Sequence, residues 1–135
     1  MLFQPLIIRQ NHWVQMESHA RQSYPIEACG LMAGVNARIE MVLPVKNTLN
    51  SRERFRMDAQ EQLEFFLQIE KQHWDLLGIY HSHPNGPPYP SKTDIEEAYY
   101  PEAANLIWSN ADGNWSCHAF YIINGKVTPI ELVIE

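Results

Sequence analysis

The alternation of apolar and polar residues along this chain predicts several short strands and two longer helices. The apolar run Leu6–Ile8 indicates a first strand. We expect Asn11 to cap a helix that continues to about Ser23, before Pro25 stops it. Apolar residues recur in this helix at helical spacing, at Trp13, Met16 and Ala20.

The following apolar stretch predicts a β-hairpin. Residues 30–35 are apolar with interspersed glycines, residues 39–45 are β-rich, and Asn36-Ala37 between them is expected to form the turn. A polar segment, 46–51, leads to a further short strand predicted at 54–57.

The middle of the chain combines a second helix with a strand and a stiff loop. Asp58-Ala59-Gln60-Glu61 matches a capping box, which predicts a helix to about Gln72. The run Leu76–Tyr80 predicts an apolar strand. Residues 84–90 contain four of the nine prolines and are expected to form a stiff loop, followed by a short helix over 93–99 that ends before Pro101.

Three strands are expected to complete the chain, over 105–108, 115–123 and 126–134, with an Asn124-Gly125 turn between the last two. Mixed strands with two substantial helices predict an α/β fold layered around one sheet. At 135 residues, the chain is expected to form a single domain, 1–135.

Charge and hydropathy exclude several classes of function. The net charge is −6 with only ten Lys and Arg residues, which argues against nucleic-acid binding. No apolar run approaches the roughly 18 residues that a membrane span needs. The start, Met1–Pro5, lacks a basic region and a long apolar region, so we expect no signal peptide and a cytoplasmic location.

The basic and sulfur-containing residues have ordinary explanations. Arg52, Arg54 and Arg56 alternate, and we interpret them as the solvated face of a sheet edge. Cys29 and Cys117 are the only cysteines and are expected to be reduced, buried thiols.

The most informative motif is His81-Ser82-His83-Pro84, which follows the apolar strand. Side chains two apart on a strand share a face, so both imidazoles are expected to point toward one site. Asp94 returns a carboxylate eleven positions later. Two imidazoles and one carboxylate suit Zn²⁺ and leave a fourth position for water or substrate, as in a catalytic site.

Each ligand also has a simpler explanation. A lone histidine is more often a hydrogen-bonded core or surface residue, which is how we interpret the other four histidines of the chain. Ser91-x-x-Asp94 is also typical of a helix start. The conjunction of the histidine pair, the Pro-rich loop and Asp94 favours a metal site, because capping and metal ligation are compatible.

These residues resemble the motif of the JAMM (MPN+) zinc metalloproteases. The similarity includes the Ser between the histidines, the Pro after them and Ser91 three positions before Asp94. Upstream, the segment 25–31 resembles the one that supplies the catalytic glutamate of that family, here Glu27. The resemblance implies a cytidine-deaminase-like α/β/α sandwich, one Zn²⁺ per chain, and hydrolysis of peptide or isopeptide bonds.

The resemblance also implies roles for individual residues. His81, His83 and Asp94 are expected to bind Zn²⁺, with water as the fourth ligand. Glu27 is expected to act as the general base and acid, and Ser91 to donate a hydrogen bond to the oxyanion. Ser82 is expected to point to the opposite face and to be structural.

The short chain resembles the stand-alone prokaryotic members, which implies a substrate that is a small ubiquitin-like or sulfur-carrier protein ending in Gly-Gly. Two other functions stay open at this point. One is a catalytically silent MPN-type scaffold or binding module, and the other is a cysteine hydrolase that uses Cys29. The sequence leaves the identity of the carrier, the oligomeric state and any gating by the loop 84–90 undetermined.

Overall fold

The computed structural model describes residues 3–135, so Met1 and Leu2, part of the start for which no signal peptide is expected, lie outside the described residues. The mixed α/β class is confirmed. In chain order the elements are β1 (Leu6–Ile8), α1 (Gln10–Ser23), β2 (Cys29–Val35), β3 (Arg38–Val45), α2 (Ala59–Lys71), β4 (Asp75–His83), α3 (Lys92–Glu96), β5 (Ala104–Ser109), β6 (Ser116–Ile123), β7 (Lys126–Ile130) and β8 (Leu132–Ile134).

The strands form one mixed sheet with the order β7-β6-β5-β4-β2-β3-β1-β8. β4 pairs in parallel with β5, and β1 pairs in parallel with both β3 and β8, whereas the remaining pairs are antiparallel. Only Glu131 separates β7 from β8, although these strands are the two ends of the order. The sheet therefore curves until its ends approach each other, and the Leu6 N–H donates to the Glu131 carbonyl there at 3.0 Å.

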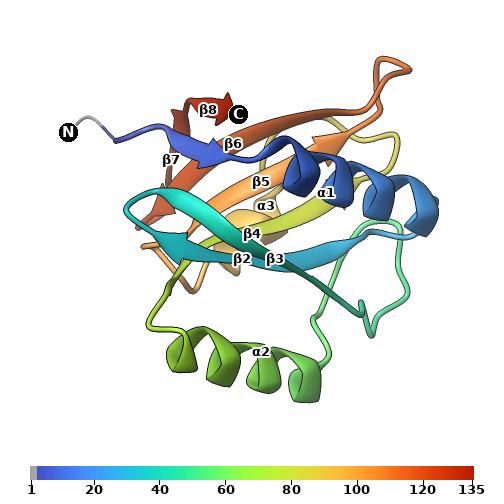
Figure 1. Cartoon of the computed structure of the whole chain (residues 1–135). Helices are drawn as coiled ribbons and strands as arrows, with labels where there is room; N and C mark the ends of the chain where they lie inside the picture. Colours follow the sequence, from blue (N-terminus) through green and yellow to red (C-terminus); the bar gives the residue numbers. More distant parts are fainter. Residues whose placement is uncertain (1–2) are drawn as a thin grey trace.

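Two apolar clusters cover the two faces of the central strands. Met16 and Ala20 of α1 pack with Met32 of β2 on one face, whereas Ile69 of α2 packs with Leu31 of β2 on the other. Figure 1 shows α1 and α2 on opposite sides of the sheet. The alternation along β2 thus gives a sheet that is buried on both faces. The finer cytidine-deaminase-like assignment stays a prediction.

Both predicted hairpin turns are confirmed. Asn36 and Ala37 have φ values of 54° and 63°, and Asn124 and Gly125 have 52° and 79°. Two consecutive positive φ values are the mark of the turn that matches the twist of paired strands. No helix within residues 3–135 is both long and apolar enough to cross a membrane.

The helix starts agree with the prediction only in part. Arg9, not Asn11, occupies the cap position of α1. Asp58 caps α2 as expected by accepting the Glu61 N–H at 3.0 Å. The Glu61 carboxylate, however, accepts the Lys46 N–H instead of closing the capping box, because that loop N–H lies within reach at 3.0 Å.

Three predicted elements are wrong in extent or kind. The helix expected over 93–99 is Lys92–Glu96, because Glu97 leaves helical backbone with φ −101° and ψ 18° and serves as the C-cap. The strand expected over 126–134 is two strands that pair at opposite ends of the sheet. The segment 54–57 is not a strand: only Met57 forms an isolated bridge, to Asn47. Its backbone instead hydrogen-bonds the Asn47 amide.

Candidate metal centre and active site

The two histidines of the motif point to the same side of β4, as their spacing predicts. They lie at the carboxyl end of the strand, where His81 is 1% exposed and His83 is 8% exposed. The Nε2 atoms of the two rings are 3.0 Å apart. Ile79, two residues before His81, packs against the apolar cluster on the face that α2 covers, so both imidazoles lie on that face of the sheet.

Asp94 reaches the same point from α3. Its Oδ2 atom lies 3.2 Å from Nε2 of His81 and 3.0 Å from Nε2 of His83. The same oxygen accepts the Ser91 N–H at 2.9 Å, while the Asp94 N–H donates to the Ser91 hydroxyl at 3.0 Å. The complete capping box therefore orients Asp94 toward the histidines, so helix capping and approach to the histidines coexist.

The protonation of His83 determines whether a proton or a cation lies between Nε2 of His81, Nε2 of His83 and Oδ2 of Asp94. Its Nδ1 lies 2.8 Å from the Pro87 carbonyl, which can only accept, so Nδ1 carries the proton. Nε2 of the neutral ring then presents a lone pair toward Oδ2 of Asp94, which also has only lone pairs. Such a contact requires a proton or a cation among the donor atoms.

The spacing of the donor atoms fits a metal ion. Tetrahedral bonds of about 2.0–2.1 Å put neighbouring ligand atoms about 3.3 Å apart, close to the 3.0–3.2 Å found among His81, His83 and Asp94. The His83–Pro87 bond is of the kind that fixes a metal-binding imidazole in its tautomer. Nδ1 of His81 has no such partner among residues 3–135, and its ring stacks on Phe55 with centroids 4.7 Å apart.

Burial and neighbouring groups shift the pKa values of Asp94 and the histidines. Burial opposes the charge on Asp94, but the neighbouring His81, the close contacts with the nitrogens of both histidines and the Ser91 N–H together hold the pKa of Asp94 well below its usual range. Burial lowers the pKa of His81. Burial also opposes the charge on His83, but its contacts with Asp94 and the Pro87 carbonyl raise its pKa. Asp94 therefore carries a negative charge where it faces the histidine nitrogens.

Glu27 lies beside the histidine pair. It is 3% exposed, and a carboxylate oxygen of Glu27 and one nitrogen each of His81 and His83 lie within 4.8 Å of one another. Oε1 of Glu27 is buried and has no hydrogen-bond partner in the described part of the chain. Burial raises the pKa of Glu27 to about 8, with Asp94 adding to the effect and His83 opposing it. A carboxyl group with a pKa near neutrality can accept and release a proton.

The backbone of Glu27 is held on both sides. Its N–H donates to the Ser51 carbonyl at 2.8 Å, and its carbonyl accepts from the Asn47 amide at 3.1 Å. The next N–H, that of Ala28, donates to the Ser82 hydroxyl at 2.8 Å. Ser82 points away from the histidines, as predicted, but it also connects the Glu27 segment to the histidine strand, which the sequence alone did not reveal.

The loop 84–90 is attached to the sheet. The Ser109 hydroxyl at the end of β5 donates to the Gly86 carbonyl at 2.5 Å, and the Asn85 N–H donates to the Asn110 side chain at 2.6 Å. These bonds place the Pro87 carbonyl against His83. Proline content predicted the stiffness, but nothing in the sequence pointed to Ser109.

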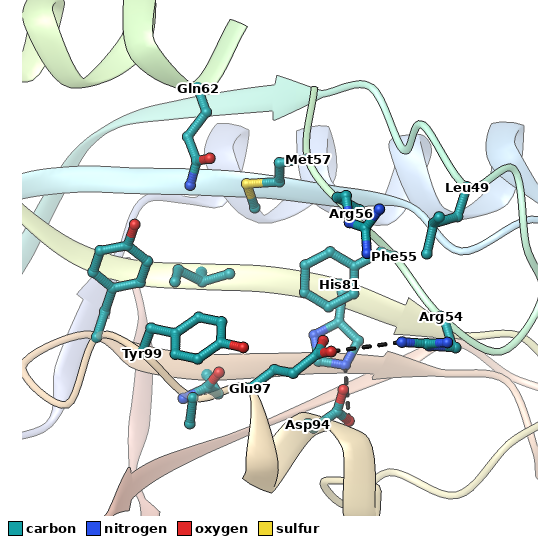
Figure 2. Close-up of a pocket in the computed structure, with 14 residues that line it drawn as sticks. Leu49, Arg54, Phe55, Arg56, Met57, Gln62, His81, Asp94, Glu97 and Tyr99 are labelled. Atoms are coloured by element: carbon teal, nitrogen blue, oxygen red, sulfur yellow. Dashed lines mark hydrogen bonds and ion pairs between the residues drawn. The ribbon is translucent and has the colours of Figure 1, made fainter. Parts of the chain in front are cut away.

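A cavity of about 280 Å³ opens beside His81 and Asp94. Figure 2 shows Phe55 above the His81 ring, with Arg54 and Arg56 on the same segment. Arg52, Arg54 and Arg56 are exposed, as expected, but they do not form a sheet edge, because the segment is not a strand. Arg54 and Arg56 line the cavity instead. The remaining lining residues are Leu49, Met57, Gln62, Ile79, Glu97, Ala98, Tyr99, Tyr100 and Asn105.

Both cysteines are free, as expected, but Cys117 is only partly buried, whereas it was predicted to be buried. Cys29 is buried in β2, and its thiol donates to the Val45 carbonyl at 3.4 Å. Burial, reinforced by the nearby Glu27, raises the pKa of Cys29 to about 12. Because the thiolate is the nucleophilic form, this environment argues against a cysteine hydrolase.

Comparison with known proteins agrees with the motif. The family described as prokaryotic homologs of the JAB domain matches residues 9–132. The CysO-cysteine peptidase of Mycobacterium tuberculosis is 35% identical, over 95% of this chain and 91% of that protein. The desampylase of Pyrococcus furiosus is 30% identical, over 98% of this chain and 93% of that protein.

Among solved structures, protein DSY2949 from Desulfitobacterium hafniense has a TM-score of 0.84 and 35% identity, over 96% of this chain and 92% of that one. These matches confirm the predicted resemblance and the predicted class of enzyme, a peptidase. The chain belongs to the family of prokaryotic homologs of the JAB domain.

Proposed function

We propose that this protein is a zinc peptidase that releases groups attached to the Gly-Gly end of a small ubiquitin-like or sulfur-carrier protein in the cytoplasm. The observation that carries the proposal is the meeting of two histidine nitrogens and one aspartate oxygen, 3.0–3.2 Å apart, beside a buried glutamate without a partner in residues 3–135. The names of its relatives support the class of substrate.

His81, His83 and Asp94 are assigned to hold the metal. Glu27 is the other candidate, because its carboxylate lies within 4.8 Å of both histidine nitrogens. Asp94 is preferred because one oxygen lies close to both nitrogens and is oriented by the Ser91 N–H. A bound Zn²⁺ supplies a Lewis acid and lowers the pKa of a coordinated water to about 7.

Glu27 is assigned to move the proton. It takes the proton of the attacking water and delivers it to the amine that leaves, and its elevated pKa suits both steps. Ser91 accepts a hydrogen bond from the Asp94 N–H, so its own hydroxyl proton can donate to the oxygen that becomes negative.

The substrate class follows from the relatives together with the cavity. One relative is named for cleaving CysO-cysteine and another is named a desampylase. An extended Gly-Gly tail is narrow enough for the 280 Å³ cavity beside His81, whereas a folded domain is not. The free thiols agree with a reducing compartment.

The test mixes the purified protein with a panel of ubiquitin-like carriers that bear peptide or isopeptide extensions, with and without chelator, and measures products by intact mass. Glu27→Gln should retain zinc and lose about 10²–10⁴-fold in rate. Glu53→Gln, which removes a nearby exposed carboxylate, is the matched control and should stay active. A fully active Glu27→Gln variant, or no cleavage under any metal condition, contradicts the proposal.

A silent scaffold is the second function that the sequence left open. A scaffold has no need of a buried carboxyl group without a hydrogen-bond partner, because leaving such a group unpaired costs stability. Retention of the complete set, Glu27 together with His81, His83 and Asp94, therefore favours the enzyme.

A further inference from the structure

The three alternating arginines of the segment 52–56 are a feature that the proposed reaction does not use. The chain has a net charge of −6, yet three of its ten basic residues lie within these five positions. Arg54 and Arg56 line the cavity next to His81 and Asp94, whereas Arg52 does not. A local excess of positive charge therefore lies beside the candidate active site of an acidic protein.

A carboxylate from the protein itself already contacts one of these arginines. Glu97, which immediately follows α3, lies 3.6 Å from Arg54, and their side chains are 43% and 53% exposed. Figure 2 shows the Glu97 carboxylate at the His81 ring, above Asp94, with a dashed line to Arg54. A half-exposed pair at this distance is weak and can exchange partners. The cavity thus contains a position that accepts a carboxylate and releases it at little cost.

Two arginines and two carboxylates line the cavity, but only one of the carboxylates contacts an arginine. Asp94 is engaged by the two histidines and Ser91, so Glu97 is the one lining carboxylate that faces an arginine. Arg56 forms no ion pair with any residue of 3–135 and lies beside Phe55. A carboxylate from a substrate would therefore give Arg56 an ion-pair partner within the cavity.

We propose that Arg54 and Arg56 bind a carboxylate of the substrate next to the bond that is cleaved, with Arg54 exchanging Glu97 for it. This inference rests on the proposed peptidase function. Planar guanidinium groups match carboxylates in geometry. Two sources place a carboxylate there: an acidic side chain just before Gly-Gly in the tail, or the α-carboxylate of a single amino acid that leaves.

Four versions of one substrate distinguish the two sources. The carrier that the panel shows to be cleaved fastest or, if none is cleaved, the one that the Glu27→Gln variant binds most tightly, is made in four versions. They carry Glu or Gln before Gly-Gly, and a terminal Cys as free acid or as primary amide. The kcat/KM of each version is measured at 0.15 M salt, where long-range effects are largely screened. For one of the two positions, the wild-type kcat/KM should be about tenfold higher for the version with a carboxylate than for its neutral counterpart. This factor is what a hydrogen bond between charged groups contributes once solvent exposure has weakened it.

The variants assign this preference to particular residues. Arg54→Gln and Arg56→Gln should each remove most of it, whereas Arg52→Gln, with the same change of charge outside the cavity, should retain it. Glu97→Gln should increase the preference, because it removes the carboxylate that competes for Arg54. It should raise kcat/KM only for the versions that carry the preferred carboxylate. Sensitivity to Glu against Gln identifies the tail, and sensitivity to acid against amide identifies the leaving group.

The proposal is overturned if all four versions react equally, or if Arg52→Gln weakens the preference as much as Arg54→Gln does. A binding measurement separates this failure from failure of the peptidase function. Fluorescent forms of the four versions are titrated against the zinc-loaded Glu27→Gln variant, with and without Arg54→Gln. A charge preference in binding without any cleavage by the wild-type protein supports the arginine site and refutes the peptidase.

Discussion

Ser82 offers a test of how the fold holds the candidate general base. It lies between the two histidines but points to the opposite face of β4. Its hydroxyl accepts the Ala28 N–H at 2.8 Å, and its own N–H donates to the Ala28 carbonyl at 3.0 Å. This reciprocal pair joins the residue after Glu27 directly to the strand that presents His81 and His83, so Ser82→Ala should loosen the connection between them.

The magnitude follows from burial. Ser82 is 0% exposed and Ala28 is 2% exposed, so Ser82→Ala leaves a buried N–H without its acceptor. That costs about 1–3 kcal/mol, which corresponds to a fall in Tm of roughly 3–12 °C for a chain of this size. A base displaced by a fraction of an ångström should lower kcat about 10–100-fold. KM and zinc content should change little, because the histidines and Asp94 are untouched.

Thermal unfolding, steady-state kinetics on a cleavable carrier fusion and metal analysis measure these three quantities. Ser116→Ala is the matched control, since Ser116 lies in β6 and its hydroxyl forms no side-chain hydrogen bond within the described residues. A Ser82→Ala variant with wild-type Tm and kcat would refute the reasoning. Lost stability with unchanged kcat would show that Ser82 supports the sheet but not Glu27.

Three further changes test other parts of the structure. A Cβ at Gly30 overlaps the ring of Tyr80, so Gly30→Ala should cost about 1–3 kcal/mol or more in a urea titration, and an unchanged midpoint contradicts the close contact. Cys29→Ala should stay within about twofold of wild-type activity, whereas complete inactivation would revive the cysteine hydrolase. Chelation should lower Tm reversibly, since zinc at 100 times its Kd contributes about 2.7 kcal/mol, and a Tm indifferent to chelator argues against the metal.

The candidate site could be predicted where it depends on local periodicity. A period of two on β4 was sufficient to bring the nitrogens of His81 and His83 within 3.0 Å. The capping pattern at Ser91 and Asp94 was also local, and it proved to be what aims the carboxylate. Glu27 is different, because no spacing relates it to residues more than fifty positions away, and only the resemblance to a family selected it.

The errors in the segment 52–57 share one cause that no local pattern contains. The amide of Asn47 donates to the carbonyls of Glu27 and Arg54, and its oxygen accepts the Arg56 N–H. These bonds satisfy backbone groups that a strand would have used for pairing, so the alternating arginines do not form a sheet edge. Because the Asn47 amide also bonds the Glu27 carbonyl, it holds the segment 54–56 close to Glu27, where Arg54 and Arg56 line the cavity. If Asn47 sets this arrangement, the positions of the base and of the proposed carboxylate-binding arginines are physically coupled.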